Sequence, residues 1–147
     1  MEENMWWHKH LFIIGLQIIA FIPYITGSYR FYKGRDNFLG WIGLGIGLDI
    51  IMTILPFLYQ FPRMEESQGA PWSSILFVIH IASAGIGMFG FMAIFIYLLI
   101  KGVKKEYRWL RKFQYLILLR LWIFGVSIAL INFLIKVIFD TRLYDYI

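Results

Sequence analysis

Long blocks of apolar residues alternate with short polar stretches along the 147-residue chain. Four blocks reach the ~20 residues that an α-helix needs to cross a hydrocarbon core of about 30 Å. The blocks lack the alternating ten-residue segments that build a membrane β-barrel. The pattern therefore predicts an all-α, polytopic membrane protein with four transmembrane helices, at about residues 11–29, 38–58, 72–100 and 113–139.

The connections between the blocks predict how the helices are arranged. Residues 30–37 and 101–112 are short connections, so each is expected to join two antiparallel neighbours as a hairpin. The middle connection, residues 59–71, is longer and contains two prolines. Two hairpins joined once make an up-down-up-down bundle, and we expect residues 1–147 to form a single transmembrane domain.

Lysine and arginine are distributed unevenly over the polar stretches. Of the 14 basic residues, nine lie in the two hairpin connections, four lie at the opposite side, and Arg120 lies inside the fourth block. Loops rich in Lys and Arg stay in the cytoplasm. We therefore expect cytoplasmic hairpin tips and outward termini in a prokaryotic plasma membrane, and we interpret the net charge of +5 as a topogenic signal, not as a nucleic-acid surface.

Composition excludes several kinds of chemistry. Sixty per cent of the residues are hydrophobic, 16 % are charged and none is cysteine. Disulfides, thiolate nucleophiles and iron–sulfur clusters are therefore excluded. The sequence also lacks a Walker loop, a zincin motif, a dinucleotide fingerprint and a nucleophile triad. We expect a protein that is not an enzyme.

Polar residues inside the apolar blocks are the candidate functional residues, because a charge at membrane depth costs at least ~2.5–3.5 kcal/mol on insertion scales. Four of them, one per helix, lie at roughly 9–14 Å from the outer surface. Asp49 is expected to pair with Arg120 or with His80. The predicted intramembrane polar layer consists of Gln17, Asp49, His80, Asn132 and Arg120. It either fixes helix register through hydrogen bonds or binds a proton, metal ion, quinone or haem.

The candidate ligands are His80 from this layer and three further residues, Met52, His8 and His10. His80 is the central one, because imidazole binds haem and metals and hydrogen-bonds quinones. Met52 is a candidate axial thioether opposite His80, with simple packing as the alternative. His8 and His10 are a candidate surface site for Cu²⁺ or Zn²⁺, with interfacial polar residues as the alternative. The cofactor itself stays open, with haem and copper as the candidates.

Small residues gather in the second and third blocks. Gly43 with Gly47, and Ser83 with Gly87, have the small-xxx-small spacing that allows helix backbones to approach closely. We expect these pairs to lie at helix–helix contacts. Room for a planar cofactor or a lipid tail is the alternative.

A family resemblance begins at Pro71. It rests on the run Ile75-Leu-Phe-Val-Ile-His-Ile-Ala-Ser-Ala-Gly85, on Tyr97-Leu-Leu, on the basic turn Lys104-Lys-Glu-Tyr-Arg108 and on the fourth helix around Trp122. Over about half its length the chain resembles the small four-helix membrane family of the CtaM or YozB proteins, a domain of unknown function. Members carry further histidines at the starts of the second and fourth helices, where this chain has Asp36-Asn37 and Tyr107-Arg108. Of the family's histidines, only His80 carries over.

The resemblance implies a role in the maturation of haem–copper cytochrome oxidase. We therefore expect a small accessory or assembly factor, or a structural subunit, of a respiratory complex, with the lipid bilayer and other membrane subunits as partners. The alternative is an electron-transfer subunit that binds haem or quinone. A small transporter or proton channel is ranked third, because broken helices and inverted repeats are not evident.

Overall fold

The computed structural model describes residues 3–58, 75–104 and 106–139, without the side chains of residues 3–10, 56, 57, 136 and 137. Its described part is all-α and contains four helices that are long and apolar enough to cross a membrane. The helical segments are α1 (Glu3–Tyr32), α2 (Phe38–Leu58), α3 (Ile75–Lys101), α4 (Arg108–Phe113), the π-helical turn η2 (Gln114–Leu118) and α5 (Leu119–Phe139). The predicted fold class is confirmed.

The fourth span consists of three segments without a break. The residues that join α4, η2 and α5 keep right-handed helical backbone angles, so α4 through α5 form one helix. This helix begins at Arg108, five residues before the predicted start at Phe113. The predicted start of the third helix, Trp72, lies outside the described residues. α1 extends past the predicted segment at both ends.

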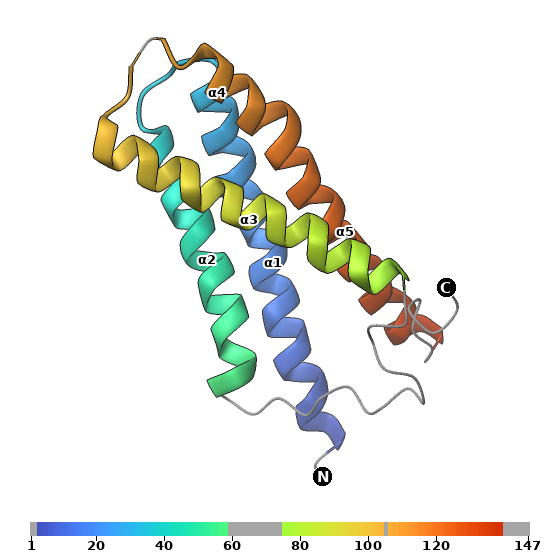
Figure 1. The fold of residues 1–147 in the computed structure, drawn as a ribbon. Coiled ribbons are helices and arrows are strands. Elements are labelled where there is room, and N and C mark those ends of the chain that lie inside the picture. The colour runs from blue at the N-terminus through green and yellow to red at the C-terminus, as the bar shows by residue number, and fades with distance from the viewer. Residues whose placement is uncertain (1–2, 59–74, 105, 140–147) are drawn as a thin grey trace.

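The helices form a bundle in which consecutive spans are neighbours. α1 packs along α2 and α3 packs along α5, whereas the contacts of α2 with α3 and of α1 with α5 are fewer. Figure 1 shows the tips of both hairpins at one end of the molecule, as the up-down-up-down prediction requires. Toward the opposite end the α1–α2 pair and the α3–α5 pair diverge. The bundle is therefore two tight hairpins that meet along a shorter central contact.

The first hairpin turns at Gly34. The backbone N–H of Gly34 donates a hydrogen bond to the carbonyl oxygen of Phe31, and the backbone N–H of Arg35 donates one to the carbonyl oxygen of Arg30. These two bonds, with φ of 68° at Gly34, form a Schellman cap that ends α1. Asn37, whose residue type tolerates the left-handed region, has φ of 62° directly before α2 begins. The chain reverses within five residues because both positions can adopt positive φ.

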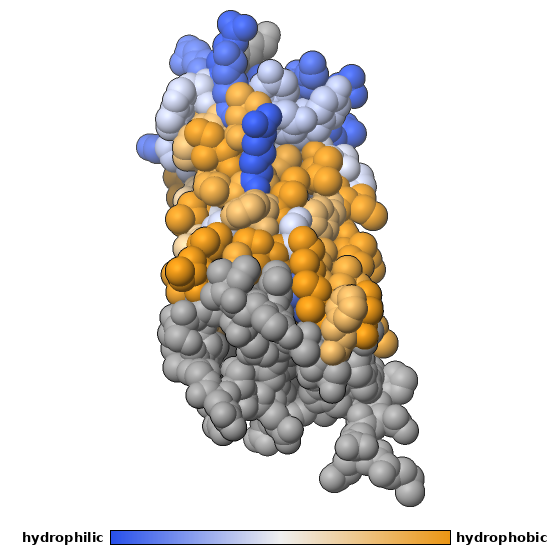
Figure 2. Space-filling model, turned by 90° about the vertical axis from the view of Figure 1, so that its right-hand side faces the viewer, coloured by the Kyte–Doolittle hydropathy of each residue, from blue (hydrophilic) through white to orange (hydrophobic). Residues whose placement is uncertain are grey.

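The outer surface of the bundle is apolar over the middle of its length. Figure 2 shows a broad hydrophobic band on one face, with hydrophilic residues gathered at the hairpin end. Large apolar side chains such as Ile22, Leu44, Phe89 and Phe124 are more than half exposed. In water such a surface would aggregate, so it indicates that lipid or other membrane helices surround the bundle.

Glycines set the closest helix approaches. A methyl group on Gly125 of α5 would lie 2.5 Å from the backbone nitrogen of Ala84, and one on Gly87 of α3 would lie 2.8 Å from the Cα of Trp122. In α1 and α2, Gly27 lies against Ile42, and Gly45 lies against the ring of Tyr24. The predicted pair of Ser83 and Gly87 does face the α3–α5 contact, as both are buried there.

In the other predicted small-residue pair, Gly43 and Gly47, only one of the two glycines has a close neighbour among the described residues. Gly43 packs against the ring of Phe95, whereas Gly47 has no neighbouring atom within 4 Å of the position where a Cβ would lie. Gly47 therefore makes no close helix contact with the described residues.

We expect Gly125→Ala to destabilise the bundle by about 1–3 kcal/mol, because the methyl group would push α5 away from the backbone of α3. Gly85→Ala is the matched control on α3, since nothing lies within 4 Å of its Cβ position. Alanine favours helix more than glycine does, so this control should be neutral or slightly stabilising. Unfolding by sodium dodecyl sulfate in detergent micelles measures both variants, and equal stability of the two would contradict the assigned contact.

Candidate functional site in the bundle core

The carboxylate of Asp49 lies buried at the centre of the bundle. The hydroxyl of Tyr24, from α1, donates a hydrogen bond of 2.7 Å to Oδ2 of Asp49. The indole Nε1–H of Trp122, from α5, donates a second bond of 2.9 Å to the same oxygen. Since α2 and α5 are not neighbours in the bundle, the Trp122 bond crosses its interior and joins opposite helices.

Aromatic rings pack around this carboxylate. The ring centroid of Tyr24 lies 4.4 Å from that of Trp122 and 4.6 Å from that of Phe91, which belongs to α3. We call Tyr24, Asp49, Phe91 and Trp122 the central cluster. Each of the four spans contributes one of its residues, and the three rings are fully buried. The cluster fills the middle of the bundle at the level of Asp49.

His80 lies outside the central cluster, at the contact between α3 and α5. Its Nδ1 is 2.7 Å from the carbonyl oxygen of Gly125. A carbonyl oxygen only accepts hydrogen bonds, so Nδ1 is the donor, and in the neutral form of the ring Nδ1 is the nitrogen that carries the proton. Nε2 then keeps its lone pair, on a ring that is only partly buried. This is how histidine ligands are often oriented, with a backbone carbonyl fixing the tautomer.

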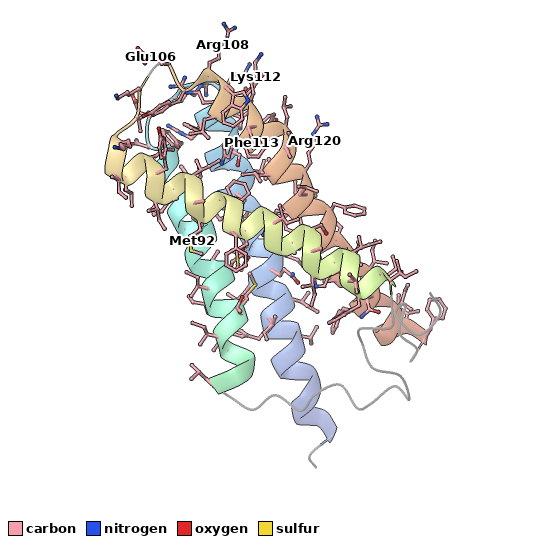
Figure 3. All side chains as sticks on the ribbon, viewed as in Figure 1. Met92, Glu106, Arg108, Lys112, Phe113 and Arg120 are labelled. Atoms are coloured by element: carbon pink, nitrogen blue, oxygen red, sulfur yellow. The ribbon has the colours of Figure 1, made fainter. Side chains whose placement is uncertain are left out.

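The predicted partners of Asp49 differ from those in the structure. The sequence suggested Arg120 or His80, whereas the structure gives Tyr24 and Trp122. Arg120 is exposed, and Figure 3 shows its side chain pointing away from the bundle. Residues two apart on an α-helix point in nearly opposite directions, because each residue turns the helix by about 100°. Since Trp122 faces the centre, Arg120 must face outward.

The remaining residues of the predicted layer occupy different levels along the bundle. Gln17 precedes Tyr24 by two turns, about 10 Å, and Asn132 follows Trp122 by nearly three turns, about 15 Å. Asn132 is buried and Gln17 is partly buried. By this estimate Gln17 and Asn132 lie farther from the hairpin tips than the central cluster does and do not share the level of Asp49.

The structure also places the other candidate ligands. Met52 is partly buried and packs against the hydrophobic core, in agreement with the packing alternative. The side chains of His8 and His10 lie outside the described ones. Among the residues that the structure describes, no three His, Asp or Glu side chains are close enough to hold a metal ion. His80 is therefore not part of a three-residue metal site within the described residues.

A second buried polar contact lies near the hairpin tips. Nε2 of Gln114 donates a hydrogen bond of 3.2 Å to the hydroxyl of Ser28, and both residues are fully buried. Gln114 is the first residue of the π-helical turn, the kind of irregularity that re-aims side chains inside a helix. The guanidinium of Arg111 lies 5.7 Å from the ring centroid of Phe31 beside it. This contact ties α1 to the start of the fourth span.

Sequence reasoning missed Tyr24, Trp122, Ser28 and Gln114. For two of them a signal exists in the sequence: tyrosine and tryptophan in membrane helices favour the interfaces, yet Tyr24 and Trp122 lie well inside their blocks. A buried Tyr or Trp needs an acceptor for its O–H or N–H. Asp49 is the acceptor that satisfies both.

We expect Asp49→Leu to destabilise the bundle by about 2–5 kcal/mol, because it leaves the Tyr24 hydroxyl and the Trp122 indole N–H buried without acceptors. Asp49→Asn is the matched control. Its amide oxygen can accept both bonds, so the change should stay within about 1 kcal/mol. Unfolding in detergent measures both variants; an Asp49→Leu variant as stable as Asp49→Asn would show that the two bonds contribute little.

Comparison with known proteins gives no relative. No family model matches the chain, and no curated protein or solved structure matches it. The resemblance to the CtaM or YozB family stays a prediction. What is established is a small multi-pass membrane protein with four apolar helices around a buried carboxylate.

Proposed function

We propose that the chain is a non-enzymatic accessory or assembly subunit of a membrane-bound respiratory oxidoreductase of the haem–copper type. The observation that carries the non-enzymatic part of the proposal is the closed central cluster. Both hydrogen bonds of Asp49 come from side chains of the chain itself, and three buried rings surround the carboxylate. A group held in this way stabilises the bundle and is poorly placed to meet a substrate.

The same observation argues against a transporter or proton channel. A conducting path needs water or mobile polar groups through the middle of the membrane. At the level of Asp49, the centre of the described bundle is filled by Tyr24, Phe91 and Trp122. Interactions with other molecules are therefore expected at the outer faces of the helices.

The respiratory part of the proposal depends on the resemblance around His80. The residues that carry it, Ile75–Gly85, form the first turns of α3 and contain both His80 and Ser83. These turns present exposed apolar side chains, among them Ile75, Val78 and Ile79, on the outside of the bundle. A helix of a partner subunit packs on such a surface as readily as lipid does.

A second candidate function is favoured by the geometry of His80. With Nδ1 bonded to the Gly125 carbonyl, Nε2 is the nitrogen that can coordinate haem iron or accept a hydrogen bond from a reduced quinone. This arrangement supports an electron-transfer subunit with a cofactor beside α3 and α5. A quinone head group suits His80 better than haem, because it needs hydrogen bonds and not two opposed ligands.

We further propose a prokaryotic plasma membrane with both hairpin tips in the cytoplasm. The described hairpin end contains the exposed basic residues Lys33, Arg35, Lys101, Lys104 and Arg108, against the acidic residues Asp36 and Glu106. An excess of Lys and Arg at one end orients a membrane protein with that end inside.

Deletion of the chain in its native host tests the accessory role. We expect the haem spectrum of the membranes to show several-fold less assembled haem–copper oxidase, with restoration by the wild-type chain and by Asp49→Asn. Co-purification from mildly solubilised membranes should recover oxidase subunits. Unchanged oxidase content, together with no oxidase subunit in the purified sample, would rule out the proposed role.

His80→Gln tests the second candidate. Glutamine can still donate to the Gly125 carbonyl, so the fold should persist while coordination through Nε2 is lost. If His80 holds a cofactor, a visible haem band or extractable quinone in the wild-type protein should disappear in this variant. Met52→Leu, a conservative replacement in a packed position, should retain it. A wild-type protein without haem or quinone would exclude a resident cofactor.

A further inference from the structure

Arg120 is a charged residue on the outer surface of a membrane-spanning helix. It lies inside the fourth span, Arg108–Ile135, and its side chain is exposed. Leu116, Ile117 and Phe124 are exposed beside it along the same helix. Figure 3 shows the Arg120 side chain directed outward, away from the other spans. Hydrocarbon does not solvate a guanidinium, so a partner of opposite charge at this place, or contact with the polar interface, would stabilise it.

The described part of the chain does not provide that counter-charge. It contains three acidic side chains: Asp36, Asp49 and Glu106. Asp49 is buried on the far side of Trp122 and accepts the bonds of Tyr24 and Trp122. Asp36 and Glu106 lie in the hairpin tips. None of the acidic side chains that the structure describes therefore compensates the charge of Arg120.

Two further cations lie on the same side of the helix. Arg108 and Lys112 are exposed, and Figure 3 shows both in line with Arg120 along the outer edge of the fourth span. We call Arg108, Lys112 and Arg120 the basic stripe. Arg120 lies two turns below Lys112, about 12 Å along the axis. An arginine side chain can extend along an apolar surface toward the interface and so shorten this gap.

We propose that the basic stripe binds the phosphate head group of an anionic phospholipid in the leaflet next to the hairpin tips. The guanidinium of Arg120 bonds the phosphate oxygens from below, because its fork geometry matches a phosphate. Arg108 and Lys112 attract the head group from the membrane surface. Leu116, Ile117 and Phe124 offer an apolar surface to the acyl chains.

A lipid fits this surface better than an acidic residue of a partner helix. The outer side of the fourth span changes from charged at the hairpin tip to apolar toward the membrane centre. A phospholipid changes in the same order from its head group to its acyl chains. Beside the stripe, Trp109 is 72 % exposed and its ring stacks on that of Phe113 at 5.3 Å. Exposed tryptophan is typical of the level of the lipid head groups. A single carboxylate of a partner helix would pair with one cation and would leave the other two cations of the basic stripe without a partner.

The full chain reconstituted in phosphatidylcholine vesicles with a minor fraction of photoactivatable phosphatidylglycerol tests this proposal, independently of the proposed respiratory function. Cross-linked peptides located by mass spectrometry should concentrate on residues 108–124. Arg120→Gln and Lys112→Gln should each lower that yield by about fivefold, the factor that corresponds to about 1 kcal/mol per basic residue near an anionic surface. Arg120→Lys should lower it less.

Lys33→Gln is the matched control, because it removes the same charge from the exposed tip of the other hairpin. It should leave the cross-links at residues 108–124 unchanged. An equal loss of cross-linking yield in Lys33→Gln and Arg120→Gln would show that the lipid is attracted by the overall charge and not by a site, and would overturn the proposal. The cross-links of the wild-type chain test the proposal without any variant. Equal labelling of residues 108–124 by photoactivatable phosphatidylcholine would overturn the proposal. Labelling by phosphatidylglycerol away from these residues would also overturn it. Recovery of a protein partner cross-linked at Arg120 in native membranes, with no lipid preference, would identify a partner carboxylate instead.

Discussion

The bundle depends on one buried carboxylate. In a membrane the hydrophobic effect does not hold helices together, so packing and hydrogen bonds must do so. Asp49 accepts bonds from Tyr24 on one neighbouring helix and from Trp122 on the opposite helix. Because an unmet donor or acceptor is costly in an apolar interior, these bonds fix the height of α1, α2 and α5 relative to one another.

Short bonds across a bundle require helices that approach closely, and glycines make this possible. Gly45 leaves space for the ring of Tyr24 beside α2, and Gly87 leaves space for Trp122 beside α3. The residues that donate to Asp49 are thus the same ones that the glycines accommodate. Polar and steric requirements coincide at the central cluster, so a change in either kind of residue should disturb the same contact.

Much of the fold can be predicted from the sequence, because the length and hydropathy of a block are sufficient to identify a membrane helix. The four spans, their antiparallel order and the shared end of the hairpin tips follow from the blocks and the short connections. Asp49, His80 and Asn132 are also recognised as buried or half-buried polar residues. The start at Arg108 could not be predicted, since charged residues can extend a helix beyond the apolar block into the interface.

The partners of the polar residues could not be predicted, because depth along a helix does not tell which way a side chain points. Arg120 and Trp122 lie at nearly the same depth, and depth alone makes Arg120 a plausible partner of Asp49. Rotation about the helix axis places Trp122 inside and Arg120 outside. That rotation is set by the fit of Trp122 against Gly87 and Tyr24, a three-dimensional match that a single sequence does not display.

Asp49 and Arg120 show how one chain can place two ionisable membrane residues in opposite ways. Asp49 accepts two hydrogen bonds at Oδ2 from side chains of the bundle and lies among its buried rings. Arg120 is directed to the exterior without a described acidic neighbour, so it is accessible to the proposed lipid phosphate. A polar group that is hydrogen-bonded inside the bundle stabilises the fold, whereas a charged group on the outside is available to other molecules. The outer faces of the helices, the outer side of the fourth span among them, are therefore where this protein is expected to contact other molecules.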